Sequence, residues 1–371
     1  MDYMVASNLD LDEIIRLKNE VKERVKEENL PIWLGDYPGD DLIKEDITSG
    51  FGRILKDGNE IVCYAALHKA SSEYEINTFI HNDLYSFSRI MTKTSHLGRG
   101  LATLLIKQML EEVKNKTSGF GLIVDDCNKL ALNVYLKVGF KFEGYSRQIY
   151  GDFSNLTYYY TPSYTDNINY DLAKFSSLKH QLFCKKLYNT SLKILGCKIP
   201  DLRKYTKRID AESFFNKIAF NTVETLMLGS ILLKNYEGKA LFNRVNQILD
   251  KTDTWVVTDL IGSTVKNIGK DPLIYYGDIL ALIKSNNTFK VRCALIILLF
   301  QYKNIKLYDK IFELIEEVKV DSYYVNMAIA WLLNTMSNKD KRVYDFVLKL
   351  NPKINKLFRQ KQRDSLRERK K

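Results

Sequence analysis

The sequence has few of the residues that build disulfide frameworks, metal centres or membrane spans. Its 371 residues include five cysteines and four histidines, and neither set shows the spacing of a disulfide framework or a zinc site. No metal is therefore expected, and the cysteines are expected to stay reduced in the cytoplasm. The longest apolar runs, such as 294–300, are far shorter than the roughly 20 residues that cross a bilayer. The N-terminus lacks a basic segment followed by an apolar core, so no secretory signal is expected.

Charge, by contrast, is abundant and unevenly distributed along the chain. Residues 1–165 contain 19 Lys and Arg against 24 Asp and Glu, whereas residues 166–371 contain 37 against 21. The net charge of +11 therefore comes entirely from the second part of the chain. A chain of this length has room for two domains. The reversal of charge predicts that only the second domain binds a polyanion such as a nucleic acid.

Helix and strand patterns alternate in the first part of the chain. Apolar residues at helical spacing predict helices over 11–28, 101–113 and 128–138. Short apolar runs predict strands, and the first two are joined by a hairpin turn at 56–59. The predicted strands are 52–55, 61–67, 74–79, 87–91 and 121–124. These patterns predict an α+β (α/β) domain over residues 1–150 with a mainly antiparallel sheet.

The second part of the chain reads as helical throughout. Residues 151–172 are rich in Asn, Ser, Thr and Tyr, and we assign them to a linker. From 173 to 371 apolar residues recur at spacings of three and four, which predicts packed helices. Three apolar segments, WVVTDLIGSTV, VRCALIILLFQY and YYVNMAIAWLLNTM, begin at intervals of about 36 and 32 residues. This period predicts helix pairs stacked as an all-α HEAT-like repeat solenoid, with a helical bundle as the alternative.

A glycine-containing segment, Ser95 to Thr103, lies between a predicted strand and a predicted helix. The small residues Gly98, Gly100 and Ala102 would let the backbone approach an anion closely. The N–H groups that open the helix would then point at a phosphate. From these residues alone, a tight turn without a ligand is the alternative.

Residues 30–148 resemble the GCN-five-related N-acetyltransferases, the GNAT family. The glycine segment is similar to their acetyl-CoA motif, and six later residues match their strand–helix motif: Val124, Asn128, Ala131, Tyr135, Gly139 and Phe140. The resemblance implies an N-acyltransferase that takes its acyl group from acetyl-CoA and passes it to an amine. It also implies a V-shaped split between two central strands that holds the cofactor.

The resemblance assigns roles to individual residues. Pantetheine would pair with the strand that contains Ile90, Met91 and Thr92. The pyrophosphate would be held by Gly98, Arg99, Gly100, Leu101, Ala102 and Thr103. Tyr135 would be the general acid that protonates the coenzyme A thiolate, unless it is a surface residue of an amphipathic helix. Asn128 would be a helix N-cap, a cofactor contact or both.

The first domain departs from the family pattern at Leu97, where the family usually has Arg or Gln. One polar contact to the cofactor is therefore expected to be lost, and a transferase that has lost activity is one alternative. Three carboxylates are candidates for the general base: Glu73, Glu75 and Asp83. Three residues stand where the family builds the wall of its acceptor site: Trp33, Tyr37 and Pro38. The acceptor amine is not identified.

Two of the three tryptophans, Trp255 and Trp331, lie in the helical part of the chain. Asp259 follows Trp255 by four residues, so the two share one face of a predicted helix. Composition alone favours both tryptophans as core residues. Residues 175–371, however, resemble the AlkD-type alkylpurine DNA glycosylases, which are built from HEAT-like repeats. The matching segments occur in the family's order: 194–204, 253–259, 291–292 and 323–331.

This second resemblance implies DNA binding and possible excision of N3- or N7-alkylated purines. It assigns Trp255, Asp259 and Trp331 to the catalytic site and Arg292 to a contact with the DNA backbone. Indole faces would stabilise the cationic base by about 0.5–2 kcal/mol each. The carboxylate would stabilise charge that develops on the sugar. A non-catalytic DNA-binding scaffold is the alternative, and the basic tail 361–371 is either a phosphate contact or a solvated terminus.

Overall fold

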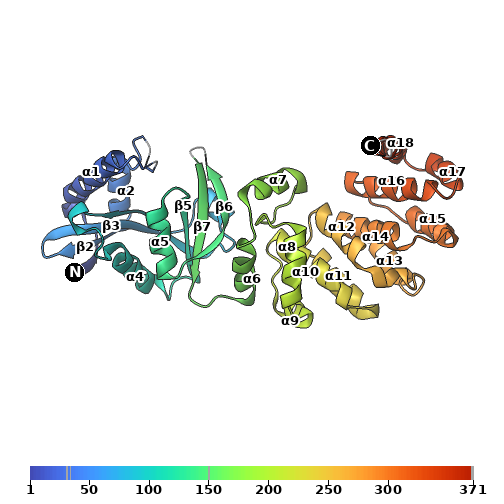
Figure 1. Ribbon diagram of the computed structural model, residues 1–371, viewed down its shortest axis with the longest axis horizontal. Coiled ribbons are helices and arrows are strands. Elements are labelled where there is room, and N and C mark those ends of the chain that lie inside the picture. The colour runs from blue at the N-terminus through green and yellow to red at the C-terminus, as the bar shows by residue number, and fades with distance from the viewer. Residues whose placement is uncertain (31, 34, 149–150, 369–371) are drawn as a thin grey trace. The chain divides into compact units, whose positions relative to one another are not determined.

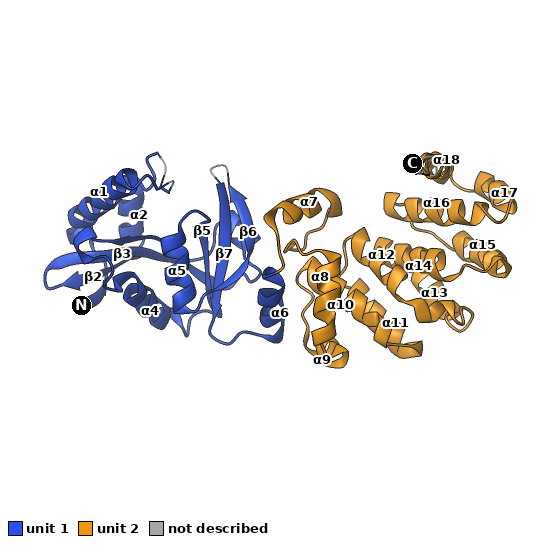
Figure 2. Cartoon of the chain, in the orientation of Figure 1, with its two compact units in different colours: residues 1–174 blue, residues 175–371 orange. Residues whose placement is uncertain are grey.

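The chain folds into two compact units, which Figure 2 shows in different colours. The computed structural model describes residues 1–30, 32–33, 35–148 and 151–368. The first unit comprises Met1–Lys174 and the second Phe175–Lys371. None of the helices in the described ranges is both long and apolar enough to cross a membrane.

The first unit is a seven-stranded mixed sheet with helices on both faces (Figure 1). Its elements are β1 (Asp2–Val5), α1 (Leu11–Glu27), α2 (Asp40–Thr48), β2 (Gly52–Asp57), β3 (Glu60–Lys69), α3 (Glu73–Thr78), β4 (Leu84–Thr92), α4 (Leu101–Val113), β5 (Gly119–Asp125), α5 (Lys129–Val138), β6 (Lys141–Gln148), β7 (Gly151–Tyr159) and α6 (Tyr164–Ala173). The strand order is β1-β2-β3-β4-β5-β7-β6. Only β4 and β5 pair in parallel, which confirms the mainly antiparallel sheet.

Two hydrophobic cores lie on opposite faces of this sheet. Side chains of consecutive strand residues point to opposite faces, and Ile54 and Leu55 of β2 accordingly belong to different cores. The core that contains Ile54 is closed by α1 and α2, because α1 carries buried apolar residues at spacings of three and four. The core that contains Leu55 is closed by α4 and α5.

The sequence did not predict β1, α2 and β6, and the structure contradicts the prediction in two further segments of this unit. Residues 74–79 were expected to form a strand, but Glu73–Thr78 is helix α3, because Ser72 and Glu75 form a capping box at its start. The segment expected to be a linker, 151–172, contains β7 and most of α6. Strand β7 pairs with both β5 and β6, so its polar residues are buried inside the sheet. The first unit therefore extends to residue 174.

The second unit consists of helices, with short 3-10 turns and no extended strand among its described residues. The helices are α7 (Leu178–Tyr188), α8 (Ile199–Tyr205), α9 (Ala211–Lys217), α10 (Val223–Leu232), α11 (Gly238–Leu249), α12 (Trp255–Thr264), α13 (Tyr276–Ile283), α14 (Thr288–Gln301), α15 (Tyr308–Glu316), α16 (Tyr323–Ser337), α17 (Arg342–Lys349) and α18 (Pro352–Glu368). Alternate helices pack in a row, α10 on α12, α12 on α14, α14 on α16 and α16 on α18 (Figure 1). This arrangement confirms the predicted all-α repeat.

The row of alternate helices is held together by apolar residues and by close approach of the backbones. Every residue from 291 to 299 of α14 is buried, because this helix is sandwiched between α12 and α16. On α12, a Cβ added to Gly262 would lie 2.5 Å from Cγ2 of Ile296 and 2.9 Å from its carbonyl carbon. Glycine at this position therefore lets α12 and α14 pack at short range.

Candidate functional site

The central strands β4 and β5 of the first unit separate along their length. They pair only at Leu84 with Gly119 and at Tyr85 with Phe120, although β4 continues to Thr92 and β5 to Asp125. The edge of β4 that faces β5 therefore has unpaired backbone groups beyond Tyr85. A cavity of about 800 Å³ opens at this split, lined by both strands, by α1, by α5 and by the segment between α1 and α2.

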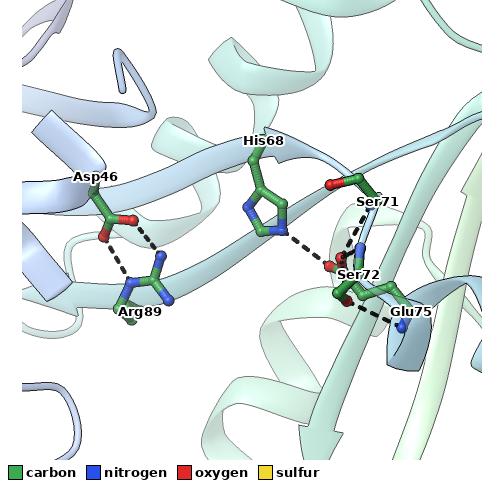
Figure 3. Close-up of polar contacts among 6 residues, drawn as sticks. All are labelled: Asp46, His68, Ser71, Ser72, Glu75 and Arg89. Atoms are coloured by element: carbon green, nitrogen blue, oxygen red, sulfur yellow. Dashed lines mark hydrogen bonds and ion pairs between the residues drawn. The ribbon is translucent and has the colours of Figure 1, made fainter. Parts of the chain in front are cut away.

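A β-bulge in β4 shapes the wall of this cavity. Met91 pairs with Tyr64 and Ser88 with Ala66, so two residues of β4 stand opposite one residue of β3. One of the two, Arg89, has φ +56°, a left-handed conformation that is uncommon for a residue with a side chain. Its side chain is held in place, because its Nε and Nη2 atoms donate to the carboxylate of Asp46 at 2.8 and 2.5 Å (Figure 3).

The glycine segment has the backbone that an anion site requires. Gly98 and Gly100 have φ +75° and +77°, and no atom lies within 4 Å of a Cβ added at either position. Glycine is thus needed for its conformation and not for space. Gly100 is the N-cap of α4 and has no side chain to cap the helix, so the first N–H groups of α4 are left for a ligand. Ala102 lines the cavity, whereas Leu101 is buried in the core and Arg99 is exposed.

The three residues expected to contact pantetheine divide between the cavity and the core. The side chains of Ile90 and Thr92 line the cavity. Met91 points to the other face of the sheet and is buried beside α1. A contact of Met91 with a ligand in the cavity would therefore be through its backbone. Leu97, the departure from the family pattern, is exposed and lines the same cavity.

Tyr135 and Asn128 both line the cavity from α5 and the turn before it. The ring of Tyr135 packs against Phe87 and Phe140, with ring centroids 5.7 and 6.1 Å apart. Burial raises the pKa of the Tyr135 phenol, and the nearby Tyr37 acts in the same direction. The hydroxyl therefore keeps its proton at neutral pH. Asn128 is the N-cap of α5, since its Oδ1 accepts the N–H of Ala131 at 3.1 Å.

The three carboxylates considered as the general base do not line the cavity. Glu75 caps α3 and lies 2.9 Å from Nε2 of His68 (Figure 3). Burial alone would raise the pKa of Glu75, but hydrogen bonds from His68 and Ser72 lower it to about 2. Asp83 pairs with Lys69 at 3.2 Å, and Glu73 lies in the first turn of α3.

Two other carboxylates, Asp36 and Asp125, do line the cavity, and the sequence analysis did not select them. Asp125 is the last residue of β5, and its Oδ1 accepts the N–H of Cys127 at 3.0 Å. Its place at the end of the predicted strand, three residues before Asn128, was a usable signal. Of the expected acceptor wall, Trp33 and Tyr37 line the cavity and Pro38 does not.

In the second unit, the predicted site residues lie on helices of the central row. Trp255 and Asp259 lie one turn apart on α12, and Trp331 lies on α16. The indole N–H of Trp255 donates to the carbonyl of Leu187 at 3.3 Å. The ammonium of Lys361, on α18, lies 5.7 Å from the ring centroid of Trp331. Lys361 therefore lies over one face of that indole.

Asp259 is partly buried, and Arg292 of α14 binds both of its carboxylate oxygens. Burial raises the pKa of Asp259, against the opposing effects of Arg292, Thr258 and Lys361. Nε and Nη2 of Arg292 donate to Oδ1 and Oδ2 of Asp259 at 3.0 and 2.8 Å. Lys361 lowers the pKa of Asp259 and also lies over the ring of Trp331.

The position of Arg292 differs from the predicted contact with the DNA backbone. Its side chain is 5% exposed, and its third nitrogen, Nη1, donates to the carbonyl of Tyr324 at 2.8 Å. All three guanidinium nitrogens therefore have partners inside the unit. A phosphate could reach Arg292 only if these bonds broke. Of the predicted basic tail, residues 369–371 lie outside the described residues.

Comparisons with known proteins identify relatives of both units. The family model described as DNA alkylation repair enzyme matches residues 168–368, and that of the acetyltransferase (GNAT) family matches residues 18–140. No curated protein matches the chain.

Solved structures similar to the chain include three acetyltransferases. A GNAT-family acetyltransferase from Streptococcus agalactiae is 19% identical over 43% of this chain and 95% of its own, with a TM-score of 0.39. Another from Listeria monocytogenes is 18% identical over 43% of this chain and 94% of its own, with a TM-score of 0.37. The aminoglycoside acetyltransferase AAC(6')-Ib in complex with coenzyme A is 18% identical over 43% and 94%, with a TM-score of 0.36.

Proposed function

Because this chain belongs to the DNA alkylation repair enzyme family and also carries a GNAT acetyltransferase domain, we propose that it joins two activities. The first unit transfers an acetyl group from acetyl-CoA to an amine. The second unit binds DNA and excises purines alkylated at N3 or N7.

The separation of β4 and β5 is the observation that supports the transferase. Their unpaired backbone edge, at Ile90 to Thr92, suits the amide groups of pantetheine. The open glycine turn and the uncapped start of α4 suit the pyrophosphate. Bound there, acetyl-CoA would supply the acyl group as an activated thioester.

The side chains in the cavity can move the protons that acyl transfer requires. The C–N bond of the new amide forms as the C–S bond breaks, so the amine loses a proton and the sulfur gains one. Tyr135, whose raised pKa keeps it protonated, is the donor to the sulfur. Asp125, at the end of β5, is the acceptor for the proton of the amine.

A thermal unfolding experiment on the whole chain tests the transferase proposal. Millimolar acetyl-CoA should raise the melting temperature of the first unit, since a ligand at 100 times its Kd stabilises by about 2.7 kcal/mol. Exposed Arg147→Gln, which changes a residue outside the cavity lining, should respond like the parent chain. If acetyl-CoA produces no shift, the proposal fails.

For the second unit, the proposal is supported by a carboxylate and two indoles on a strongly basic part of the chain. A purine alkylated at N3 or N7 is cationic and is already a good leaving group. The glycosidic C–N bond breaks, the base leaves in neutral form, and water adds its hydroxyl to the sugar carbon. Asp259 would stabilise the positive charge on the sugar and take the proton of the water. Trp255 and Trp331 would stabilise the cationic base.

A non-catalytic DNA-binding scaffold is the second candidate for this unit. It is favoured by Arg292, which binds both oxygens of Asp259 and offsets its charge. The test is release of 7-methylguanine from methylated duplex DNA, with Asp259→Asn as the variant. Excision predicts release that this variant abolishes without loss of DNA binding. Salt-sensitive DNA binding without release above background would instead identify a scaffold.

A further inference from the structure

Arg24, on α1, has buried N–H groups without partners in the cavity of the first unit. It lines the cavity, and its side chain is 19% exposed. Its Nε and Nη1 atoms are buried and have no hydrogen-bond partner among the residues that the structure describes. Among the described residues, the carboxylate that forms an ion pair with Arg24 belongs to Glu28, 3.8 Å from Nε, too far for a hydrogen bond.

This state is unusual for an arginine in this unit. Arg53 donates to Glu112 at 2.7 and 2.8 Å, and Arg89 donates to Asp46. A charged group that is buried without hydrogen bonds is costly, because it loses its water and gains nothing in return. Two nitrogens of a cation that lines a cavity, both without partners, therefore point to an anion that binds there.

Arg24 lies where α1 and the segment after it line the cavity. Its neighbours on α1, Val21 and Val25, pack in the core that contains Met91, on one face of the sheet. The glycine segment leads into α4, which covers the opposite face. Arg24 therefore reaches the cavity from the face that α1 covers, one helical turn after Glu20, whose carboxylate accepts the N–H of Thr94 at 2.6 Å.

The cavity also contains groups that suit the rest of an acceptor. Trp33 and Tyr37, from the segment after α1, give it aromatic walls. This segment is tied to α1, because Nζ of Lys22 donates to the carbonyl of Gly35 at 3.2 Å. The carboxylates of Asp36 and Asp125 supply negative charge for an ammonium group.

We propose that the acyl acceptor is an amine that also carries an anionic group, a carboxylate or a phosphate, and that Arg24 binds this group. The inference rests on the proposed transferase function and adds its substrate class. The acceptor is then zwitterionic: its ammonium faces the aspartates and its anion faces Arg24. Polyamines and other amines without a negative charge are excluded as good acceptors.

The test measures release of the coenzyme A thiol by the whole chain with matched amines. The carboxylate probes are L-phenylalanine and glycyl-L-phenylalanine, each paired with its C-terminal amide. The phosphate probe is O-phosphoethanolamine, paired with ethanolamine. We expect kcat/KM to favour an anionic probe over its neutral partner by about tenfold or more, as for a hydrogen bond between charged groups. The preferred pair tells carboxylate from phosphate.

Arg24→Gln should remove this preference and leave the KM for acetyl-CoA within about twofold of the parent value, since the lost contact is with the acceptor. The control is Arg16→Gln, an exposed arginine of the same helix, which should keep the preference. Equal use of neutral partners, or no transfer to any anionic probe, overturns the proposal. So does a higher KM for acetyl-CoA in Arg24→Gln with the preference intact. Failure of acetyl-CoA to raise the melting temperature of the parent chain would instead refute the transferase function itself.

Discussion

Replacing Arg292 with methionine tests whether its pair with Asp259 is part of the structure of the second unit. Methionine keeps much of the side-chain volume and removes the three hydrogen bonds to Asp259 and Tyr324. Removing one partner of a buried ion pair costs about 3–5 kcal/mol of stability, because the remaining charge stays buried without an opposite charge beside it. The side chain of Asp259 keeps 19% exposure, so water offsets part of this cost. The lower end of the range, about 3 kcal/mol, is therefore expected.

Unfolding of the whole chain, followed by tryptophan fluorescence, measures this loss. Two of the three tryptophans lie in the second unit, so the signal reports mainly its unfolding. For a unit of this size, about 3 kcal/mol lowers the melting temperature by roughly 6–12 °C. The control is Arg342→Met, because Arg342 pairs with Asp340 but is 59% exposed. Because water screens this exposed pair, the control should lose much less stability than Arg292→Met. An equally small loss in Arg292→Met would refute the structural role and leave Arg292 available for phosphate.

The loss should also depend on pH. Burial raises the pKa of Asp259, and Arg292 opposes that effect, so the pKa rises further in Arg292→Met. A carboxyl group whose pKa is higher in the folded state binds more protons when folded, so stability falls as the pH rises through this window. The variant should therefore be most destabilised at neutral pH, and the difference from the parent should shrink as the pH falls and Asp259 is protonated. A difference that grows on acidification would contradict this account.

Three further predictions concern single side chains. Tyr135→Phe should lower kcat of acyl transfer by about 10²–10⁴-fold. The KM for acetyl-CoA and the melting temperature should stay nearly unchanged, because the hydroxyl only donates a proton. A variant as fast as the parent chain would exclude Tyr135 as the acid. Gly98→Ala should abolish the thermal shift by acetyl-CoA. The control is Gly58→Ala, because Gly58 has a similar positive φ in a hairpin outside the cavity. This control should lose about 1–2 kcal/mol of stability and keep the shift. Gly262→Ala should destabilise the second unit by about 1–3 kcal/mol in urea unfolding. Gly277 in α13 has open space around it, so Gly277→Ala should leave the stability unchanged or raise it.

Local patterns in the sequence predicted much of the fold. The helix over Leu101–Val113 was predicted with its observed bounds, because apolar spacing and the preceding glycines both mark its start. The helix predicted over 128–138 is α5, and Asn128 is its N-cap. The hairpin between β2 and β3 was also located by its turn residues. Each of these features depends on residues that are close together in the sequence.

The failures depend on contacts between distant residues. Asn155 and Thr157 gave β7 the composition of a linker, and only its pairing with β5 and β6 buries them. Arg292 matched a position for a phosphate contact, but its partner Asp259 lies 33 residues away on another helix. A basic side chain gives no sign in the sequence of whether it is already paired. The unpaired state of Arg24 could be recognised only from three-dimensional coordinates for the same reason.

The two proposed sites differ in the state of their polar groups, and this difference has a consequence for binding. In the first unit, Nε and Nη1 of Arg24 have no partner among the described residues, and no side chain of the N-cap Gly100 caps α4. A ligand there gains hydrogen bonds without breaking any. In the second unit, Asp259 is paired with Arg292, and Lys361 lies over Trp331. A cationic base at that indole would meet the positive charge of Lys361, so the gain from its own cation–π contact is partly cancelled. DNA affinity in this unit should therefore come mainly from phosphate contacts, with little discrimination between damaged and intact bases before the base leaves the stack.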